Sequence, residues 1–276
     1  MAVKIIAEIG KNFITKETEQ SVEECLANAK ELVVAAKQAG ADVIKTQCHV
    51  FKDERYKRSE ARYEWIKRNE AATPYETFWK PLRAFCDELG ISFLCTPMSK
   101  DAAVKINDLV DEWKVGSADI LDFDLLDYII STHKPVIISS GMSTKQQLQK
   151  SLVHLIGSGS RFSILHCVSL YPCPLDKLNL NTIDYLKHKY PYAPIGFSDH
   201  SLDTLAPALA VSKGATIIEK HFTLDRESFG PDHKVSLLPD EFKEMVRNVR
   251  KAETMLGVED KILLNQERAY WKNFRT

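Results

Sequence analysis

Two histidines in the last third of the chain are candidates for binding a metal ion. His200 lies in the segment GFSDHSL and His221 in IIEKHF, and each follows a short apolar run. Two imidazole ligands with open coordination positions suit a divalent transition ion such as Mn²⁺, Fe²⁺, Co²⁺ or Zn²⁺. The alternative is that one histidine packs in the core while the other caps a loop. The pair can share an ion only if the fold places the two runs side by side.

Two lysines and several hydroxyl side chains at the ends of other apolar runs could hold an anion. Lys45 and Lys114 would neutralise a phosphate or carboxylate, and hydroxyl groups would donate hydrogen bonds to its oxygens. The hydroxyl candidates are Thr96, Ser117, Ser139 and Ser198. There is no Walker loop, so a phosphate-bearing substrate is expected rather than a nucleotide. Each of these residues could instead be a solvated strand end or a helix cap.

Glu8 differs from these residues because it interrupts an apolar run, 3–9. A carboxylate inside such a run must be paired or functional, since burying an unpaired charge is costly. The candidate catalytic residues are therefore Glu8, Lys45, Lys114, His200 and His221.

These side chains converge only in a fold that brings the ends of many strands together. Short β-branched runs alternate with longer amphipathic segments eight times along the chain. The expected strands are 3–9, 42–47, 92–96, 112–116, 135–140, 162–167, 194–198 and 215–222. Runs this apolar suit parallel strands that are buried on both faces. The sequence therefore predicts an α/β fold, a (β/α)8 TIM barrel, as one domain over 1–276, with the candidate residues at one rim.

The segments between these runs have apolar residues at helical spacing. The clearest helical segments are 19–38, 75–89, 144–156, 204–212 and 239–256, and glycines follow most of them. Two longer segments interrupt the alternation. The segment 50–73 is dense in charge and is expected to form a loop with a short helix over the barrel mouth, and 223–238 is expected to form another loop. Both would lie at the face where barrel enzymes keep their sites.

Composition excludes several classes of protein. The chain has 37 Lys and Arg against 38 Asp and Glu, so no excess charge points to nucleic acid. No apolar run approaches the roughly 20 residues that span a bilayer, and no signal peptide is recognisable. We expect a cytoplasmic protein with no membrane partner. Its six cysteines form no CxxC pair and are expected to be free thiols.

Eight segments, in matching order along the chain, resemble the N-acetylneuraminate (sialic acid) synthase family, which includes legionaminate and pseudaminate synthases. The segments are AEIG, AGADVIKTQ, FLCTP, WKVGSAD, KPVIISSGMST, LHCVSLYPCP, GFSDHSL and GATIIEKHFTLDRESFGPDHKVSL. The resemblance implies a (β/α)8 synthase that joins phosphoenolpyruvate to an open-chain N-acetylated amino sugar and releases phosphate. The sugar would be N-acetylmannosamine or a diacetamido-dideoxy hexose. The resemblance also implies a homodimer.

The resemblance assigns roles position by position. Phosphoenolpyruvate would be bound by Lys45, Thr96, Lys114, Ser117, Ser139, Ser169 and Ser198, and Ser169 stands where relatives often have asparagine. The sugar would be bound by Gln47, Asp119, Tyr171 and Asp232. His200 and His221 match the metal ligands, with Mn²⁺ the usual ion, and Glu8 matches the acidic residue of the AEIG motif.

One departure concerns the end of the chain. Most relatives continue into an antifreeze-like C-terminal domain that gives an arginine to the partner subunit's sugar site, whereas this sequence stops at Thr276. The resemblance therefore predicts a barrel-only member. The arginines of segment 50–73 are candidates to replace that lid. They are Arg55, Arg58, Arg62 and Arg68.

Three other activities stay open. A Schiff-base aldolase would use Lys45, Lys114 or Lys220 as its amine nucleophile. A synthase of another 3-deoxy sugar acid would use the same phosphoenolpyruvate site with a different acceptor. A non-catalytic barrel would bind sugar without turnover.

Overall fold

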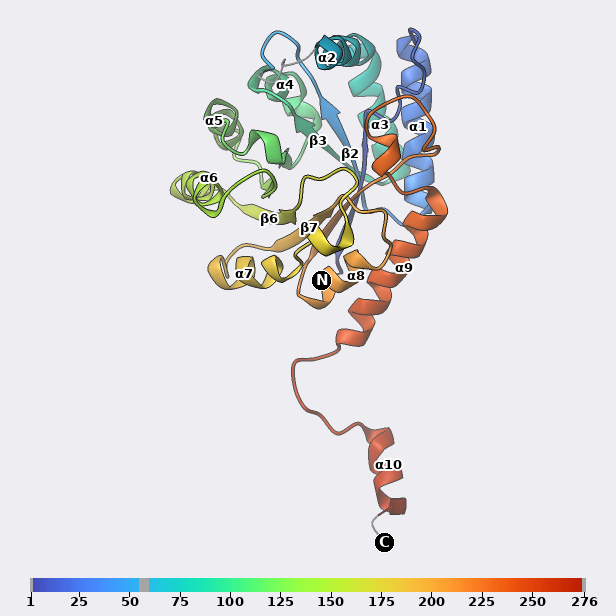
Figure 1. Ribbon diagram of the computed structural model, residues 1–276, viewed down its shortest axis with the longest axis vertical. Coiled ribbons are helices and arrows are strands. Elements are labelled where there is room, and N and C mark those ends of the chain that lie inside the picture. The colour runs from blue at the N-terminus through green and yellow to red at the C-terminus, as the bar shows by residue number, and fades with distance from the viewer. Residues whose placement is uncertain (1, 55–59, 275–276) are drawn as a thin grey trace.

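Eight parallel strands close into a barrel in chain order (Figure 1). The last strand pairs with the first. The computed structural model describes residues 2–54 and 60–274. The strands are β1 (Lys4–Gly10), β2 (Val43–Cys48), β3 (Ser92–Pro97), β4 (Trp113–Val115), β5 (Val136–Ser139), β6 (Phe162–Cys167), β7 (Ile195–Asp199) and β8 (Ile217–His221). Each lies within two residues of its predicted bounds, so the predicted (β/α)8 TIM barrel is confirmed.

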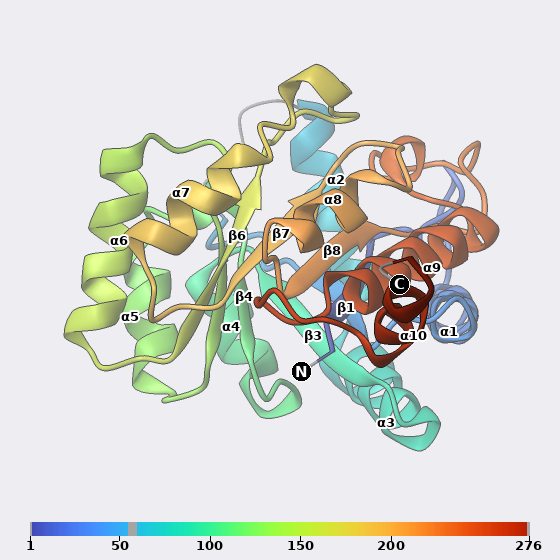
Figure 2. The ribbon, with the colours of Figure 1, turned by 90° about the horizontal axis from the view of Figure 1, so that it is seen from below.

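Helices surround the strands, as Figure 2 shows from below. They are α1 (Val22–Gln38), α2 (Glu60–Ala72), α3 (Lys80–Leu89), α4 (Lys100–Ile106), α5 (Phe123–Ser131), α6 (Lys145–Gly157), α7 (Asn181–Lys189), α8 (Ala206–Ser212) and α9 (Pro239–Leu256). A further helix, α10 (Asn265–Phe274), follows outside the barrel. The predicted start of α1 at residue 19 is wrong because Ser21 caps the helix and forms a capping box with Glu24. The segment predicted as one helix over 75–89 begins with a π-helical turn, Tyr75–Trp79, before α3.

The inside of the barrel is built in layers. Side chains two residues apart on a strand point the same way. The lower layer is apolar and consists of Ile6, Val43, Leu94, Ile137, Leu165 and Ile217. On β7 this layer has only Gly196, where a Cβ would lie 2.5 Å from the Ile217 carbonyl oxygen. Two residues further along, each strand contributes one side chain to a second layer, which we call the polar ring. Its members are Glu8, Lys45, Thr96, Lys114, Ser139, Cys167, Ser198 and Glu219.

The segment 50–73 contains a longer helix than predicted. α2 covers 13 residues and is fixed to the loop between β1 and α1 by Arg68, which donates to the backbone carbonyls of Glu17 at 2.6 Å and Thr18 at 2.5 Å. Two other arginines of this segment, Arg55 and Arg58, lie outside the described residues. The segment 223–238 is the predicted loop, with one short 3₁₀ turn, His233–Val235.

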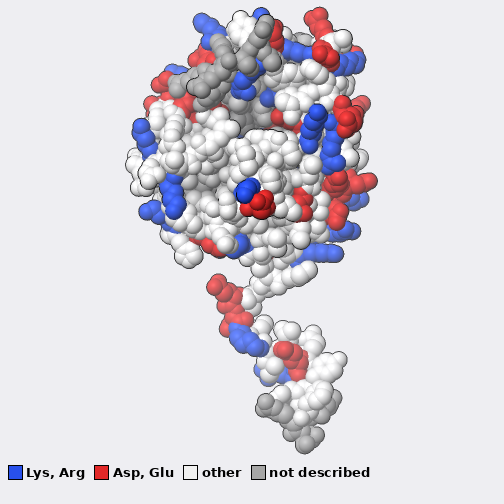
Figure 3. Space-filling model, viewed as in Figure 1, with Lys and Arg blue, Asp and Glu red and all other residues white. Residues whose placement is uncertain are grey.

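Several expectations from composition can be compared with the structure. All six cysteines are buried and free, as predicted. Within 2–54 and 60–274, no helix is both long enough and apolar enough to cross a membrane. Charged side chains of both signs lie around the edge of the face in Figure 3, while its centre is largely uncharged. Beyond α9 the chain leaves the barrel, and α10 stands apart from it (Figure 1).

Candidate active site

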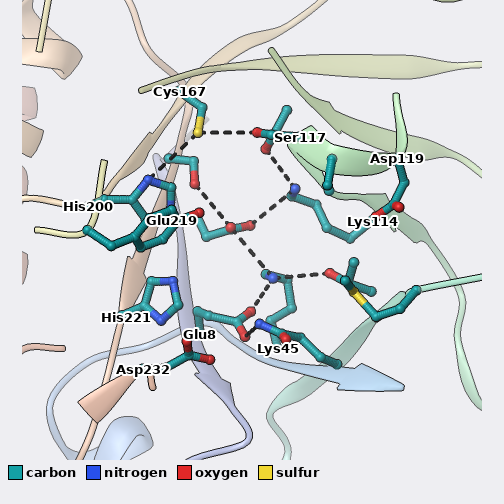
Figure 4. Close-up of a pocket in the computed structure, with 18 of the residues that line it drawn as sticks. Glu8, Lys45, Lys114, Ser117, Asp119, Cys167, His200, Glu219, His221 and Asp232 are labelled. Atoms are coloured by element: carbon teal, nitrogen blue, oxygen red, sulfur yellow. Dashed lines mark hydrogen bonds and ion pairs between the residues drawn. The ribbon is translucent and has the colours of Figure 1, made fainter. Parts of the chain in front are cut away.

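A cavity of about 260 Å³ lies directly above the polar ring, at the C-terminal ends of the strands (Figure 4). All eight members of the ring line it. Further lining residues that the sequence predicted are Gln47, Ser117, Asp119, Tyr171, His200, His221 and Asp232. Ser169 does not line the cavity, but its hydroxyl lies 3.8 Å from the Cys167 sulfur at the cavity wall. The structure therefore brings the predicted site residues together, with Ser169 just behind the wall.

Buried charges of both signs form a network in the ring. Lys45 makes an ion pair with Glu8, and its Nζ lies 3.6 Å from Oε1 of Glu219. Nζ of Lys114 lies 3.9 Å from Oε2 of Glu219. The Ser198 hydroxyl donates to Glu219 at 3.1 Å. Glu219 is thus the carboxylate that both lysines share (Figure 4).

Neutral hydroxyls complete the surroundings of the two lysines. Nζ of Lys114 donates to the Ser139 hydroxyl at 2.7 Å, and Nζ of Lys45 donates to the Thr96 hydroxyl at 3.1 Å. An anion placed among these groups would meet two cations and several hydroxyls that can rotate to donate to it.

The network sets the protonation of its members. Burial opposes ionisation of Glu219, but Lys114 and Lys45 outweigh it and lower the pKa of Glu219 to about 2. Burial raises the pKa of Glu8, although Lys45 opposes this shift. Burial also lowers the pKa of Lys114 against the attraction of Glu219, whereas for Lys45 the two carboxylates overcome burial and raise its pKa. Of the two carboxylic acids, Glu8 is therefore the one that takes up a proton more readily.

Glu219 has no role in the sequence-based prediction, although a signal for it exists. It lies two residues before His221 on β8, so both side chains point into the barrel. Lys220, between them, points out. Its Nζ donates to Asp199 at 2.5 Å and to the Ser201 carbonyl at 2.6 Å, and it does not line the cavity. Of the three lysines considered for a Schiff base, only Lys45 and Lys114 reach the cavity.

The β1 end of the cavity holds a second group of polar residues. Gln47 donates to Glu8 at 3.1 Å and accepts from Nζ of Lys11 at 2.9 Å, and Lys11 also lies 3.9 Å from Asp232. Gly10 makes this arrangement possible, because its φ is +48° and a Cβ there would lie 2.9 Å from Asp232. Lys11 is a lining residue that the sequence-based prediction leaves out.

The two histidines lie close together, as a shared ion requires. Their ring centroids are 5.4 Å apart, and Tyr171 packs on His200 at 4.2 Å. Nδ1 of His200 lies 2.9 Å from the Val168 carbonyl, which can only accept, so in the neutral ring Nδ1 carries the proton and Nε2 keeps the lone pair that a metal would need. Nδ1 of His221 is buried and has no hydrogen-bond partner among the described residues.

These observations fit a divalent ion with few protein ligands. Within the described residues, no group of three or more His, Cys, Asp and Glu side chains has the geometry of a metal site. If His200 and His221 hold an ion, the protein supplies two imidazoles, and water or substrate completes the coordination. Metal binding by His200 and His221 stays a prediction that their placement favours.

Asp119 has a carboxyl group that burial makes unusually basic. It lies in the turn after β4, one wall of the cavity, and Oδ2 has no hydrogen-bond partner among the described residues. Burial, together with the nearby carboxylates of Asp122 and Glu54, raises its pKa from the ordinary 3.8 to about 7. The group is therefore poised to change its charge near neutral pH.

Asp119→Asn is expected to increase the free energy of unfolding at pH 8 by about 2–4 kcal/mol. The unfolded chain releases the Asp119 proton near pH 3.8 and the folded protein releases it only near pH 7, so the wild type loses stability as pH rises between these values. The gain should be full above pH 7 and absent near pH 4. Urea unfolding of the variant and the wild type at pH 8 and at pH 4 measures this difference in the free energy of unfolding. Asp184→Asn is the control, because this exposed aspartate is paired with Lys213 at 2.8 Å and should show no gain.

Comparisons with known proteins identify the family of this chain. The chain matches the NeuB family over residues 32–261. It is 35% identical over 279 residues to the N,N'-diacetyllegionaminic acid synthase of Legionella pneumophila, covering 95% of this chain and 75% of that protein. An uncharacterised protein of Methanocaldococcus jannaschii is 42% identical over 241 residues, 87% of this chain and 70% of that one.

A solved structure supports the same assignment. The N-acetylneuraminic acid (sialic acid) synthetase of Leptospira borgpetersenii, crystallised with citrate, superposes with a TM-score of 0.89 at 30% identity. The superposition covers 99% of this chain and 91% of that one. With the barrel, the polar ring and a match over most of its length, the chain belongs to the NeuB family.

Proposed function

We propose that this protein condenses phosphoenolpyruvate with an open-chain N-acetylated amino sugar, giving a nonulosonic acid and phosphate. The observation that carries the proposal is the polar ring, in which two buried lysines and several hydroxyls lie beside a pair of histidines. Relatives named as legionaminic, pseudaminic and sialic acid phosphate synthases support a sugar-acid product.

The ring would hold phosphoenolpyruvate. Lys45 and Lys114 would neutralise its phosphate and carboxylate, because buried ammonium groups interact strongly with anions. Hydroxyls would donate to the remaining oxygens from Thr96, Ser117, Ser139 and Ser198. The acceptor sugar would lie above it, against Gln47, Asp119, Tyr171 and Asp232.

The bond changes follow from this placement. C3 of phosphoenolpyruvate attacks the sugar aldehyde carbon, and the aldehyde oxygen takes up a proton. Water adds to the cation formed at C2 and gives up a proton. The bond between C2 and the bridging oxygen then breaks, phosphate leaves with the electron pair, and the hydroxyl left on C2 loses its proton to become the ketone. Glu8 suits the role of proton donor to the new hydroxyl, since burial raises its pKa. A divalent ion such as Mn²⁺, held by His200 and His221, would supply Lewis-acid polarisation of the aldehyde.

Phosphate release should require both metal and sugar. After chelation, release from phosphoenolpyruvate is expected to fall to background and to return with Mn²⁺, only in the presence of one sugar from a panel. The panel contains N-acetylmannosamine, its 6-phosphate, and 2,4-diacetamido-6-deoxy hexoses. Phosphate release without a sugar, or no phosphate release with any sugar of the panel when Mn²⁺ is present, would contradict the proposal.

Isotope labelling tests which bond breaks. Phosphoenolpyruvate with ¹⁸O in the bridging position should give labelled phosphate, whereas label retained in the product would reject this mechanism. A Schiff-base aldolase would instead be trapped by borohydride with a keto acid. The homodimer and the cytoplasmic location implied above remain predictions, and size-exclusion chromatography would test the first.

A further inference from the structure

Arg62 connects the active-site cavity with a second cavity that no role described so far uses. It lies on α2 and lines the active-site cavity. It also lines an adjoining cavity of about 310 Å³, which we call the side chamber. Ser117, Ala118 and Met142 line both cavities, so the two adjoin at this wall. The other walls of the side chamber are Ile120, Leu121 and Ser143, which make it mainly apolar.

Two buried residues fix the position of Arg62. Its Nη2 lies 3.2 Å from Oε1 of Glu54, whose Oε2 lies 2.7 Å from Nδ1 of His49. His49 follows β2 directly and is 1% exposed, and Glu54 is 3% exposed. Burying a carboxylate is costly unless its oxygens are paired, and here both are. Arg62 is therefore held against the end of β2 through two side chains, although it comes from a long insertion.

We propose that Arg62 is a specificity residue that binds the end of the acceptor sugar remote from its aldehyde, and that Glu54 and His49 are positioning residues for it. The inference rests on the proposed function, since it requires an acceptor in the active-site cavity. It assigns the side chamber to a substituent of that acceptor.

The charges near Arg62 and the apolar lining of the side chamber determine which substituent of the acceptor fits there. The guanidinium of Arg62 already faces the Glu54 carboxylate, and the Asp119 carboxyl interacts with both. A phosphate dianion would meet these carboxylates as well as the arginine. An uncharged acetamido group remote from the aldehyde, as at C4 of a 2,4-diacetamido hexose, suits the place better, because its carbonyl oxygen can accept from Arg62 while its methyl group would contact Ile120 and Leu121.

Steady-state kinetics of Arg62→Gln, Arg62→Lys and Lys67→Gln, and of Glu54→Gln described below, test this assignment. Arg62→Gln is expected to raise KM for a 2,4-diacetamido acceptor about tenfold or more, the effect of losing one hydrogen bond to a charged donor, with KM for phosphoenolpyruvate within about twofold. Arg62→Lys should recover part of the loss. Lys67→Gln is the matched control on the same helix. Its ammonium lies 3.8 Å from Glu64 at the surface, so its kinetics should not change.

Glu54→Gln has an expected kinetic effect that a purely structural role of Glu54 would not produce. Removing this carboxylate should increase kcat/KM for N-acetylmannosamine 6-phosphate relative to that for the uncharged sugar, because one repulsive charge is lost. Circular dichroism and unfolding midpoints verify that each variant folds. If Glu54→Gln fails to fold, the comparison of Arg62→Gln with Arg62→Lys decides.

The outcomes separate the two proposals. If the wild type shows no acceptor-dependent phosphate release with any sugar, the proposed function fails and this inference fails with it. If the wild type turns over but Arg62→Gln leaves acceptor KM unchanged, only the inference is overturned. An equal rise in both KM values would also overturn it, since Arg62 would then act on phosphoenolpyruvate.

Discussion

Lys114→Met is expected to lower kcat/KM for phosphoenolpyruvate about 1,000-fold, near the upper range for loss of one preorganised donor. Nζ of Lys114 is buried, donates to Ser139 at 2.7 Å and faces Glu219 at 3.9 Å. Methionine has a similar length and fills the same space, but it removes the positive charge that the substrate anion would meet. Phosphate release at varied phosphoenolpyruvate concentration, with Mn²⁺ and the accepted sugar fixed, measures the loss.

Lys4→Met is the matched control for this variant. Lys4 also lies on a barrel strand and pairs with a glutamate, Glu112, at 3.0 Å, but at the opposite end of the barrel from the cavity. Its kinetics should equal those of the wild type. A decrease of less than about tenfold for Lys114→Met would show that this lysine is not part of the anion site.

Glu219→Ala is expected to lower the free energy of unfolding by about 3–5 kcal/mol. The substitution removes the carboxylate that Lys45 and Lys114 share, so two buried ammonium groups lose a partner, and the Ser198 hydroxyl loses its acceptor. Glu219→Gln should lose less, because an amide oxygen can still accept from Ser198. Urea denaturation at pH 7.5 compares the variants.

A partly exposed glutamate supplies the reference for this measurement. Glu112→Ala removes the partner of Lys4, a pair whose side chains are 39% and 26% exposed, and should cost no more than about 1 kcal/mol. Equal costs for Glu219→Ala and Glu112→Ala would mean that water reaches the ring and that its charges do not depend on one another.

The barrel could be predicted from the sequence because its strands are nearly all apolar until their ends. Polar residues at those ends therefore stand out, and Lys45, Lys114 and Ser139 were identifiable before any geometry was known. Which side of a strand each residue occupies depends on register. Alternation along a strand puts Glu219 and Lys220, adjacent in sequence, on opposite sides of the barrel wall, but it does not by itself say which of them faces inward.

Other parts of the site depend on contacts that no periodic pattern encodes. Lys11 reaches the cavity through a turn at Gly10 that has positive φ. Arg62 reaches it because it pairs with a buried carboxylate, Glu54, at the start of the same insertion. Tertiary packing determines where such loops lie. The sequence shows that they are rich in charged residues, but it does not show which of these side chains points into the cavity.

Closure of the barrel has a consequence for how the protein gains activity as it folds. Glu8 on the first strand and His221 on the last are direct neighbours across the β1–β8 pairing. Contacts between residues so distant in the chain form slowly, because a large loop must close first. During refolding, helical circular dichroism should therefore recover before enzymatic turnover does. Turnover is thus a kinetic reporter of the final strand pairing, and a fragment that lacks either terminal strand cannot assemble the centre.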